Sequence, residues 1–164
     1  MHQVILLLGT NQGNRLKNLT VACRSICDCI GKLKKSSSIY ETEPWGFQTE
    51  NTFYNQVIVI SSEFSPNEVL DKILAIEIQM GRKRTNAKGY SSRIIDIDIL
   101  FYDSLFLSQP NLSIPHPKIQ ERRFVLVPLN EILSDFIHPF LDQEIKMLLK
   151  KCSDELKVKK VYAS

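Results

Sequence analysis

Apolar residues in the first half of the chain follow regular spacings. A continuous apolar run is typical of a buried strand, recurrence at every third or fourth position is typical of a helix, and alternation is typical of a half-buried strand. A glycine after the last apolar position favours the end of a helix. These spacings predict a strand at Val4–Leu8, a helix at Leu16–Ile30 that ends at Gly31, and strands at Ser37–Thr42 and Phe53–Ser62.

The second half begins with a strong helix signal. Ser65 is suited to cap a helix, Pro66 to occupy its first position, and Glu68 to complete a capping box. Further along, the pattern predicts a helix as far as Gly81, a loop at Arg82–Arg93, a strand at Ile94–Tyr102, irregular chain at Ile114–Phe124, a helix at Leu141–Leu149 and a Lys-rich tail. The order β-α-β-β-α-β with later additions predicts an α+β sandwich, with helices on one side of an antiparallel sheet.

Length and composition narrow the class of protein. The 164 residues suffice for one domain with its own core, so we expect a single domain over residues 1–164. The formal charge of +3 is too small to identify a nucleic-acid binder. The apolar run near the N-terminus is too short for a signal peptide or a membrane span, which predicts a cytoplasmic protein. No Cys-x-x-Cys pair occurs, and we expect reduced core thiols at Cys23, Cys27, Cys29 and Cys152.

Two aspartates alternate with isoleucines in the predicted strand after the loop. Asp96 and Asp98 should project from one face, with Cα atoms roughly 7 Å apart. The positions expected to face the core are Ile95, Ile97, Ile99 and Phe101. Paired carboxylates repel each other and lose hydration, and a divalent cation relieves both problems. Mg²⁺ prefers such oxygens and completes its shell with water and substrate phosphates. The alternative is a strand with exposed aspartates and no metal.

A cluster of basic residues precedes the acidic pair. The span that contains it holds no acid, and its basic members are Arg82, Lys83, Arg84, Lys88 and Arg93. Glycines and serines between them favour flexibility. A flexible basic loop beside two carboxylates indicates a lid over a complex of metal and polyphosphate. The alternative for the loop alone is a solvated surface segment.

Two further groups are suited to ligand binding. His116 lies between two prolines that restrict the backbone, and Arg122 and Arg123 follow it, so a neutral imidazole is suited to bond phosphate oxygens. The alternative is a structural histidine in a Pro-rich turn. Phe53 and Asn55 share a strand face, where a ring and an amide can stack on a flat heterocycle and bond its edge. The alternative for Phe53 is core packing.

Taken together and in this order, the motifs resemble the 6-hydroxymethyl-7,8-dihydropterin pyrophosphokinase family. The resemblance runs over nearly the whole chain, from Gly9-Thr10-Asn11 to Pro128-Leu129. Its most specific parts are Tyr40-Glu41-Thr42-Glu43-Pro44, Phe53-Tyr54-Asn55-Gln56, Ile76-Glu77-Ile78-Gln79-Met80-Gly81-Arg82, Arg93-Ile94-Ile95-Asp96-Ile97-Asp98-Ile99-Leu100, and Ile114-Pro115-His116-Pro117 with Arg122-Arg123-Phe124.

The resemblance implies a ferredoxin-like α+β fold and transfer of diphosphate from ATP to 6-hydroxymethyl-7,8-dihydropterin, with release of AMP, in folate biosynthesis. It implies two Mg²⁺ ions at Asp96 and Asp98, and ATP as co-substrate. It assigns catalysis to Arg82, Arg84, Arg93, Asp96 and Asp98. It assigns pterin binding to Thr42, Glu43, Trp45, Phe53, Asn55 and Phe124. It assigns ATP binding to Leu70, Glu77, Arg84, Tyr90, Arg93, Ile99, Ser113, His116 and Arg122. We expect a cytoplasmic monomer with small-molecule substrates and no nucleic-acid or membrane partner.

The chain departs from the family pattern at two places. Tyr90-Ser91-Ser92 stands where the family often has Trp-Gly-Pro, and we expect Tyr90 to replace the tryptophan as the lid aromatic. Asn111 stands where many members have an arginine, so one basic contact is missing or supplied by Arg123.

Two other functions fit part of the pattern. An RNA-binding module would stack bases on Phe53 and Tyr54, but Asp96 and Asp98 would repel the nucleic acid. Filter binding across a salt series tests this function. Another metal-dependent nucleotidyl- or glycosyltransferase would share the Asp-x-Asp strand. Pterin-dependent release of AMP, rather than release of pyrophosphate, excludes this second function.

Overall fold

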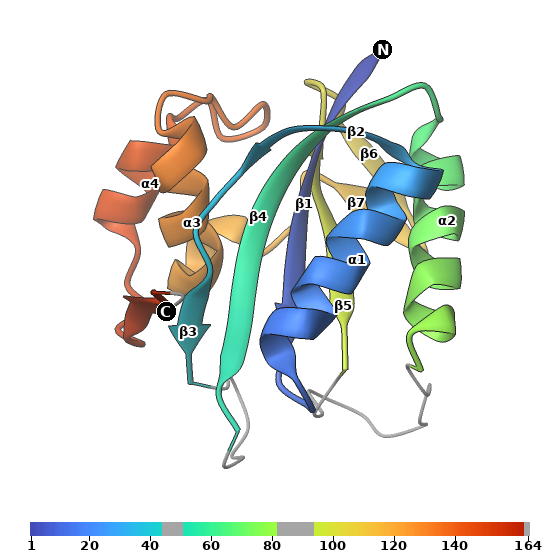
Figure 1. Cartoon of the computed structure of the whole chain (residues 1–164). Coiled ribbons are helices and arrows are strands. Elements are labelled where there is room, and N and C mark those ends of the chain that lie inside the picture. The colour runs from blue at the N-terminus through green and yellow to red at the C-terminus, as the bar shows by residue number, and fades with distance from the viewer. Residues whose placement is uncertain (44–50, 82–93, 163–164) are drawn as a thin grey trace.

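An antiparallel sheet forms the centre of the fold (Figure 1). The computed structural model describes residues 1–43, 51–81 and 94–162. Within these residues the sheet has six strands, which are β1 (His2–Thr10), β2 (Gly31–Ser36), β3 (Tyr40–Thr42), β4 (Phe53–Ser62), β5 (Asp96–Tyr102) and β8 (Val158–Lys160). The other elements are α1 (Arg15–Cys29), α2 (Pro66–Gln79), β6 (Leu107–Gln109), β7 (Leu112–Ile114), the 3₁₀ turn η1 (Ile119–Glu121), α3 (Arg123–Leu133) and α4 (Ile145–Lys151).

The strand order confirms the predicted β-α-β-β-α-β core. The sheet runs β5-β1-β4-β3-β8, β2 pairs with a second part of β4, and every pairing is antiparallel. Helices α1 and α2 each cross the sheet between two strands, as in the ferredoxin-like arrangement. The small hairpin of β6 and β7, which the pattern did not predict, follows β5.

The predicted strand at Ser37–Thr42 is wrong in its bounds. β2 and β3 pair with successive parts of β4, and the chain between them bridges the gap through Ser37. The Ser37 N–H donates to the carbonyl of Val57 (2.8 Å), and its hydroxyl accepts the N–H of Val57 (3.0 Å). β2 is mostly exposed and rich in lysine, so it lacks the buried face that an alternating pattern would reveal.

Both crossover helices begin where the sequence predicts. The Asn14 side chain accepts the N–H of Lys17 at the start of α1, and Ser65 with Glu68 forms the predicted capping box of α2. Gly31 does not cap α1 in a left-handed conformation. It is the first residue of β2, where an added Cβ would clash with the carbonyl oxygen of Ser61, so glycine is needed there for close approach.

Helices cover both faces of the sheet, whereas the pattern predicted them on one side (Figure 1). The α1/α2 face buries one aliphatic core and the α3/α4 face buries a second. Helix α3 was not predicted, because Pro128 lies inside it and proline disfavours helix interiors. Its buried stripe, which includes Val125, Leu126 and Leu129, stabilises it against the sheet. The C-terminal additions therefore make a third layer.

The end of the chain also differs from the prediction. Helix α4 begins four residues after the expected start of the helix at Leu141–Leu149. The Lys-rich tail contains β8, which adds a strand to the outer edge of β3. The tail is thus part of the sheet.

A bulge in β5 changes which way its last residues face. The register with β1 shifts so that Leu100 is an extra residue. Ile95, Ile97 and Ile99 face the α1/α2 core as predicted, but Phe101 joins Leu100 in the α3/α4 core. The predicted facing of Phe101 is wrong because strict alternation stops at the bulge.

The cysteines are free thiols, as predicted, but two of them are outside the core. Cys23 and Cys152 are half-buried, whereas Cys27 and Cys29 are exposed on α1. Among the helices of the described residues, none is long and apolar enough to cross a bilayer.

Candidate active site

The candidate site lies at the end of the sheet where β1 and β3 finish and β4 and β5 start (Figure 1). There Asn55, Gly9 and Asp96 stand opposite one another on β4, β1 and β5. Because neighbouring strands are about 4.8 Å apart, the backbones of Asn55 and Asp96 are about 10 Å apart across Gly9. The row places an amide and a carboxylate on either side of a residue that has no side chain.

Asp96 and Asp98 project together from the α3/α4 face. Asp98 stands opposite Leu7, whose side chain lies in the α3/α4 core, and the intervening Ile97 faces the other core. Both aspartates are half-buried, so both keep access to solvent. The prediction that they share a face is confirmed.

The donor set at this pair suits magnesium. Within residues 1–43, 51–81 and 94–162, no group of three or more His, Cys, Asp or Glu side chains comes together. Zinc sites use three or four protein ligands, whereas Mg²⁺ is often held by one or two carboxylates, waters and substrate phosphates. Two half-buried carboxylates with solvent access therefore fit Mg²⁺ shared with a phosphate ligand.

Glu77 on α2 holds the acidic strand from its edge. Its carboxylate accepts the backbone N–H of Ile97 over 2.9 Å, and the residue is 2% exposed. Ile97 lies between the two aspartates, so this bond fixes the backbone from which both project. The expected role of Glu77 in ATP binding stays a prediction.

Gly9, Asn55 and Thr42 form the floor of the site near β3 and β4. Asn55 and Thr42 are buried, and the Asn55 amide donates to the Thr42 hydroxyl over 3.1 Å. A Cβ at Gly9 would lie 2.8 Å from the amide oxygen of Asn55. The absence of a side chain at Gly9 therefore lets Asn55 keep this orientation, with its amide held in one direction.

Phe53 and Phe124, the expected pterin sandwich, lie on the same side of the sheet. Phe53 is two residues before Asn55 on β4, opposite Thr42, and Phe124 is the second residue of α3. Both rings are half-buried, and α3 packs against β3 and β4. Glu43, which follows β3, is exposed.

His116 is a neutral hydrogen-bond donor beside the acidic pair. Its backbone N–H donates to the carbonyl of Leu100 in β5 (3.0 Å), and its ring Nδ1 accepts the backbone N–H of Lys118 (3.2 Å). Burial and the charges of Arg122 and Lys118 lower the pKa of His116 to about 4, against the opposing charge of Asp96. The proton of the neutral ring is therefore on Nε2, which is suited to donate to an anion.

Arg122 is the cap residue between η1 and α3. It is 7% exposed, and its guanidinium lies 5.6 Å from the centre of the Phe124 ring. Its positive charge is one of the causes that lower the pKa of His116. A buried arginine beside a neutral histidine is suited to bind phosphate oxygens.

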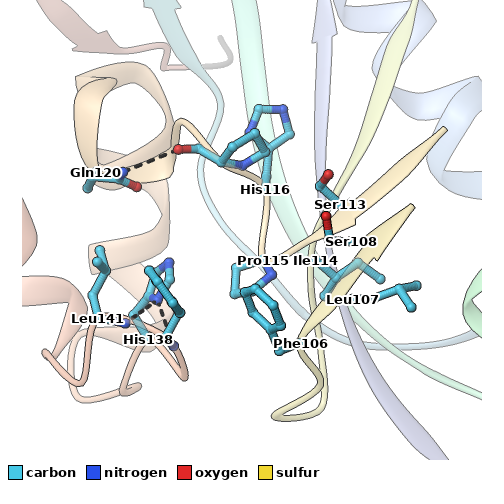
Figure 2. A pocket seen from close by; sticks show the side chains of 12 residues that line it. Phe106, Leu107, Ser108, Ser113, Ile114, Pro115, His116, Gln120, His138 and Leu141 are labelled. Atoms are coloured by element: carbon cyan, nitrogen blue, oxygen red, sulfur yellow. Dashed lines mark hydrogen bonds between the residues drawn. The ribbon is translucent and has the colours of Figure 1, made fainter. Parts of the chain in front are cut away.

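A pocket of about 280 Å³ opens beside His116 (Figure 2). It lies between the β6–β7 hairpin, the Pro115–Pro117 segment and the loop from His138 to Leu141. Ser113 and His116, two expected ATP-binding residues, both line it, and Gln120 bonds the carbonyl of Pro117 at its side (3.2 Å). Apolar walls come from Phe106, Phe140 and Leu141.

Two expected ATP-binding side chains do not reach the acidic face. Ile99 is 5% exposed in the α1/α2 core, and Leu70 packs against that same core from α2. Contact between Ile99 and a ligand would have to use its backbone. The expected site residues that lie outside the described part of the chain are Trp45, Arg82, Arg84, Tyr90 and Arg93.

Sequence reasoning gave Gly9 only a weak role. The motif Gly9-Thr10-Asn11 signals a turn after a strand, but the importance of Gly9 comes from its position between Asn55 and Asp96. That position depends on two strand registers, and no local spacing reveals them. The bond between Asn55 and Thr42 was also not predicted, because the two residues are thirteen positions apart.

The topology and the site define a ferredoxin-like α+β protein in which an acidic pair, a neutral histidine and a buried arginine lie near one end of the sheet. The sequence pattern of the 7,8-dihydro-6-hydroxymethylpterin-pyrophosphokinase (HPPK) family matches residues 5–134. The chain belongs to this family.

Individual relatives agree with that assignment. A 2-amino-4-hydroxy-6-hydroxymethyldihydropteridine pyrophosphokinase of Porphyromonas gingivalis is 39% identical over 139 residues, which are 83% of this chain and 93% of the relative. An enzyme of the same name from Aquifex aeolicus is 35% identical over 146 residues, 89% of each chain.

A solved structure agrees on the fold. A Plasmodium falciparum HPPK-DHPS crystal structure superposes with a TM-score of 0.76 at 20% identity, over 92% of this chain. The present chain spans 45% of that longer chain. At this identity the likeness shows the fold alone.

Proposed function

We propose that this chain transfers the terminal diphosphate of ATP to the hydroxymethyl group of 6-hydroxymethyl-7,8-dihydropterin and releases AMP, a step of folate biosynthesis. The observation that carries the proposal is the row Asn55–Gly9–Asp96. It carries an oriented amide, suited to read a heterocycle edge, and a carboxylate suited to a metal–phosphate complex, on backbones about 10 Å apart. This distance suits an acceptor heterocycle on one side and a donor phosphate chain on the other.

In this proposal Asp96 and Asp98 are the residues that would hold two Mg²⁺ ions, which would supply positive charge to the phosphates. When bound, Mg²⁺ neutralises charge on the bridging and equatorial phosphate oxygens. The reaction therefore depends on magnesium. Glu77 supports the same step by holding the backbone between the two aspartates.

The phosphate chain of ATP is bound by His116 and Arg122. His116 donates from Nε2, and Arg122 contributes a fixed positive charge from the start of α3. We propose that Arg82, Arg84 and Arg93 add further charge, and that Tyr90 covers the nucleotide. These contacts make catalysis mainly a matter of positioning and electrostatics.

The pterin lies between Phe53 and Phe124. Asn55 and Thr42 bond its edge, helped by Glu43 and Trp45. The hydroxymethyl oxygen attacks the β-phosphorus in line. The bond from that phosphorus to the oxygen that it shares with the α-phosphorus breaks, and AMP leaves with that oxygen. The hydroxyl proton is released.

RNA binding on the sheet is disfavoured by a specific feature of the fold. RNA-binding modules of ferredoxin-like topology stack bases on an open sheet face. Here the α1/α2 layer covers one face, and α3 packs against β3 and β4 on the other. Filter binding across a salt series should therefore show only weak retention of RNA, at low salt.

The direct test is a product assay. The purified chain is incubated with ATP, Mg²⁺ and reduced hydroxymethylpterin, and nucleotides are separated by chromatography. We expect AMP only when pterin and metal are both present. Release of pyrophosphate, or of AMP without pterin, would contradict the proposal.

We also propose that the chain acts as a monomer in the cytoplasm. Every residue in the proposed reaction comes from one chain, so a second copy is not needed for the site. Light scattering during gel filtration should give a mass near the chain mass of 18.9 kDa.

A further inference from the structure

The segment that follows α4 returns to the sheet beside the candidate site. The family match ends at residue 134, and this segment lies beyond it. Its strand β8, the unlabelled red arrow beside the C-terminus in Figure 1, pairs antiparallel with β3. Val158 lies opposite Thr42 and Lys160 opposite Tyr40. The Val161 N–H continues the ladder by donating to the carbonyl of Ile39 (2.8 Å). The strand that carries Thr42 is therefore held between β4 and the C-terminal segment.

The same segment also holds the start of α3. One carboxylate oxygen of Asp154 accepts the N–H of Arg123 (3.0 Å), and the other accepts the N–H of Leu156 (3.0 Å). Arg122, the cap residue of α3, supplies no side-chain cap of its own. A carboxylate at a helix N-terminus satisfies a backbone donor and interacts favourably with the helix dipole. Asp154 thus fixes the turn that carries Arg122 and Phe124.

A third contact joins α3, β8 and the chain before β3. Glu131 on α3 accepts the N–H of Ser38 (2.6 Å) and its hydroxyl (2.7 Å). The ammonium of Lys160 lies 3.6 Å from the same carboxylate. Burial alone would raise the pKa of Glu131, but these bonds hold it below its usual value. The three elements are therefore tied around one ionised carboxylate.

Chain length makes the two main attachments interdependent. Val158 is four positions after Asp154, and four positions span at most about 14 Å when the chain is fully extended. While both attachments are formed, the start of α3 and the end of β3 can therefore separate by no more than this reach plus the lengths of the two contacts. These two places carry Phe124, which is one wall of the proposed pterin site, and Thr42, which is part of its floor.

We propose that residues 154–161 act as a positioning clamp that sets the distance between Phe124 and Thr42 in the pterin site. The inference rests on the proposed function. Asp154 and Lys159 are its key positions, and neither is a catalytic residue, because their contacts are to the backbone of α3 and β3. The clamp limits how far Phe124 and Thr42 can separate, and so it favours pterin binding.

A substitution at Lys159 can weaken the pairing of β8 with β3 without removing a side-chain contact of the site. Hydrogen-bonded pairs alternate along an antiparallel ladder, so the bond from Val161 to Ile39 makes Glu41 and Lys159 the next bonded pair. Lys159→Pro removes the N–H of that pair. Lys159→Ala keeps it and serves as the matched control, since the side chain of Lys159 is exposed.

A substitution at Asp154 can remove the second attachment, which joins the C-terminal segment to the start of α3. Asp154→Ala removes the acceptor of the Arg123 N–H, whereas Asp154→Asn keeps an acceptor oxygen and should restore most of the function. Glu155→Ala, at the exposed neighbouring carboxylate, is the control for a change of charge.

The test measures KM for pterin, KM for ATP and kcat in each variant. Because small displacements of binding groups are costly, we expect Lys159→Pro to raise KM for pterin about tenfold and KM for ATP less than about twofold. Asp154→Ala should raise KM for both substrates, because Arg122 moves with Phe124. Lower melting temperatures with unchanged KM for pterin would overturn the proposal.

A second readout separates this inference from the proposed function. Amide hydrogen exchange of residues 40–42 and 53–55 should quicken in Lys159→Pro but not in Lys159→Ala. If the wild-type chain gives no pterin-dependent AMP, the proposed function fails while exchange still tests the clamp. Unchanged exchange in Lys159→Pro would overturn the clamp whatever the activity.

Discussion

At the level of Asp96 the two faces of the sheet differ in chemistry. Toward α1 and α2, the strands carry Leu8, Ile95 and Ile97 in a continuous aliphatic core. Toward α3, the same strands carry Asn55, Gly9 and Asp96. Successive residues of a strand therefore differ in role, because one stabilises the fold on the α1/α2 face and the next is suited to bind a ligand on the other face.

The difference follows from where each helical layer ends. Helices α1 and α2 cover their face along the strands, whereas the aliphatic rows on the α3/α4 face stop at Leu7, Val57 and Leu100. Beyond that point this face carries polar side chains, Gly9 and the half-buried ring of Phe53, and α3 begins only at Arg123. Substitutions on the two faces should consequently affect different quantities, namely stability on one and substrate binding or turnover on the other.

The largest expected effect is on turnover. Asp98→Ala removes a carboxylate from the ligand-binding face while leaving both cores intact. We expect AMP release to fall at least about 100-fold, as it does when a principal electrostatic group is removed, with little change in melting temperature. Asp71→Ala, at an exposed aspartate of α2, is the control. Wild-type turnover in Asp98→Ala would contradict the metal role.

The next effect concerns pH and the histidine on the same face. The pKa of His116 is about 4 in the folded chain, below its ordinary value of 6.5. Between pH 4 and pH 6.5 the unfolded chain therefore binds more protons at His116 than the folded chain does. The contribution of His116 to the free energy of unfolding is fully present above pH 6.5 and is lost as pH falls toward 4. Relative to His116→Asn, we expect the ligand-free wild type to lose about 2–3 kcal/mol between pH 7 and pH 4.5.

Denaturant unfolding of both proteins at the two pH values measures this difference. The variant is the reference because other groups titrate in both proteins. Equal losses of stability in the two proteins would show that His116 is not held neutral by its surroundings.

A smaller effect is expected at Gly9, where a substitution should affect both pterin binding and stability. Gly9→Ala places a Cβ 2.8 Å from the Asn55 amide oxygen, so the amide must turn away from Thr42. We expect KM for pterin to rise several-fold and stability to fall by about 1–3 kcal/mol, as for other overpacked sites. Calorimetric titration with pterin measures the affinity, and thermal unfolding measures the stability. Unchanged pterin affinity would show that Asn55 does not read the pterin.

The smallest effect is expected on the opposite face. Ile97→Val, beside both aspartates in the sequence, removes one methylene from the α1/α2 core and should cost about 0.5–1.5 kcal/mol. Turnover of the folded protein should stay close to the wild-type value. A loss of turnover as large as that of Asp98→Ala would remove the distinction between the faces.

Local signals predicted the parts of the fold that depend on neighbouring residues. The capping box of Ser65 and Glu68 gave the start of α2, and alternation gave the bounds of β4. The shared face of Asp96 and Asp98 follows from the same two-residue period. These features need no knowledge of distant chain.

The features that escaped prediction depend on distant chain. α3 forms despite Pro128 because the sheet buries its apolar stripe, and β8 forms in a Lys-rich tail because β3 offers a free edge. The bulge at Leu100 could not be predicted, because Ile99, Leu100 and Phe101 are all apolar and the pattern does not show which face each of them takes. The position of Gly9 between Asn55 and Asp96 required two strand registers. Tertiary pairing thus decided what local spacing could not.

The most direct measurement concerns magnesium-dependent nucleotide binding. Calorimetric titration with a non-hydrolysable ATP analogue, with and without Mg²⁺, is compared between the wild type and a variant with Asp96→Asn and Asp98→Asn. The account predicts binding that Mg²⁺ strengthens in the wild type, and a loss of that strengthening in the variant. Equal magnesium dependence in both proteins would contradict the account.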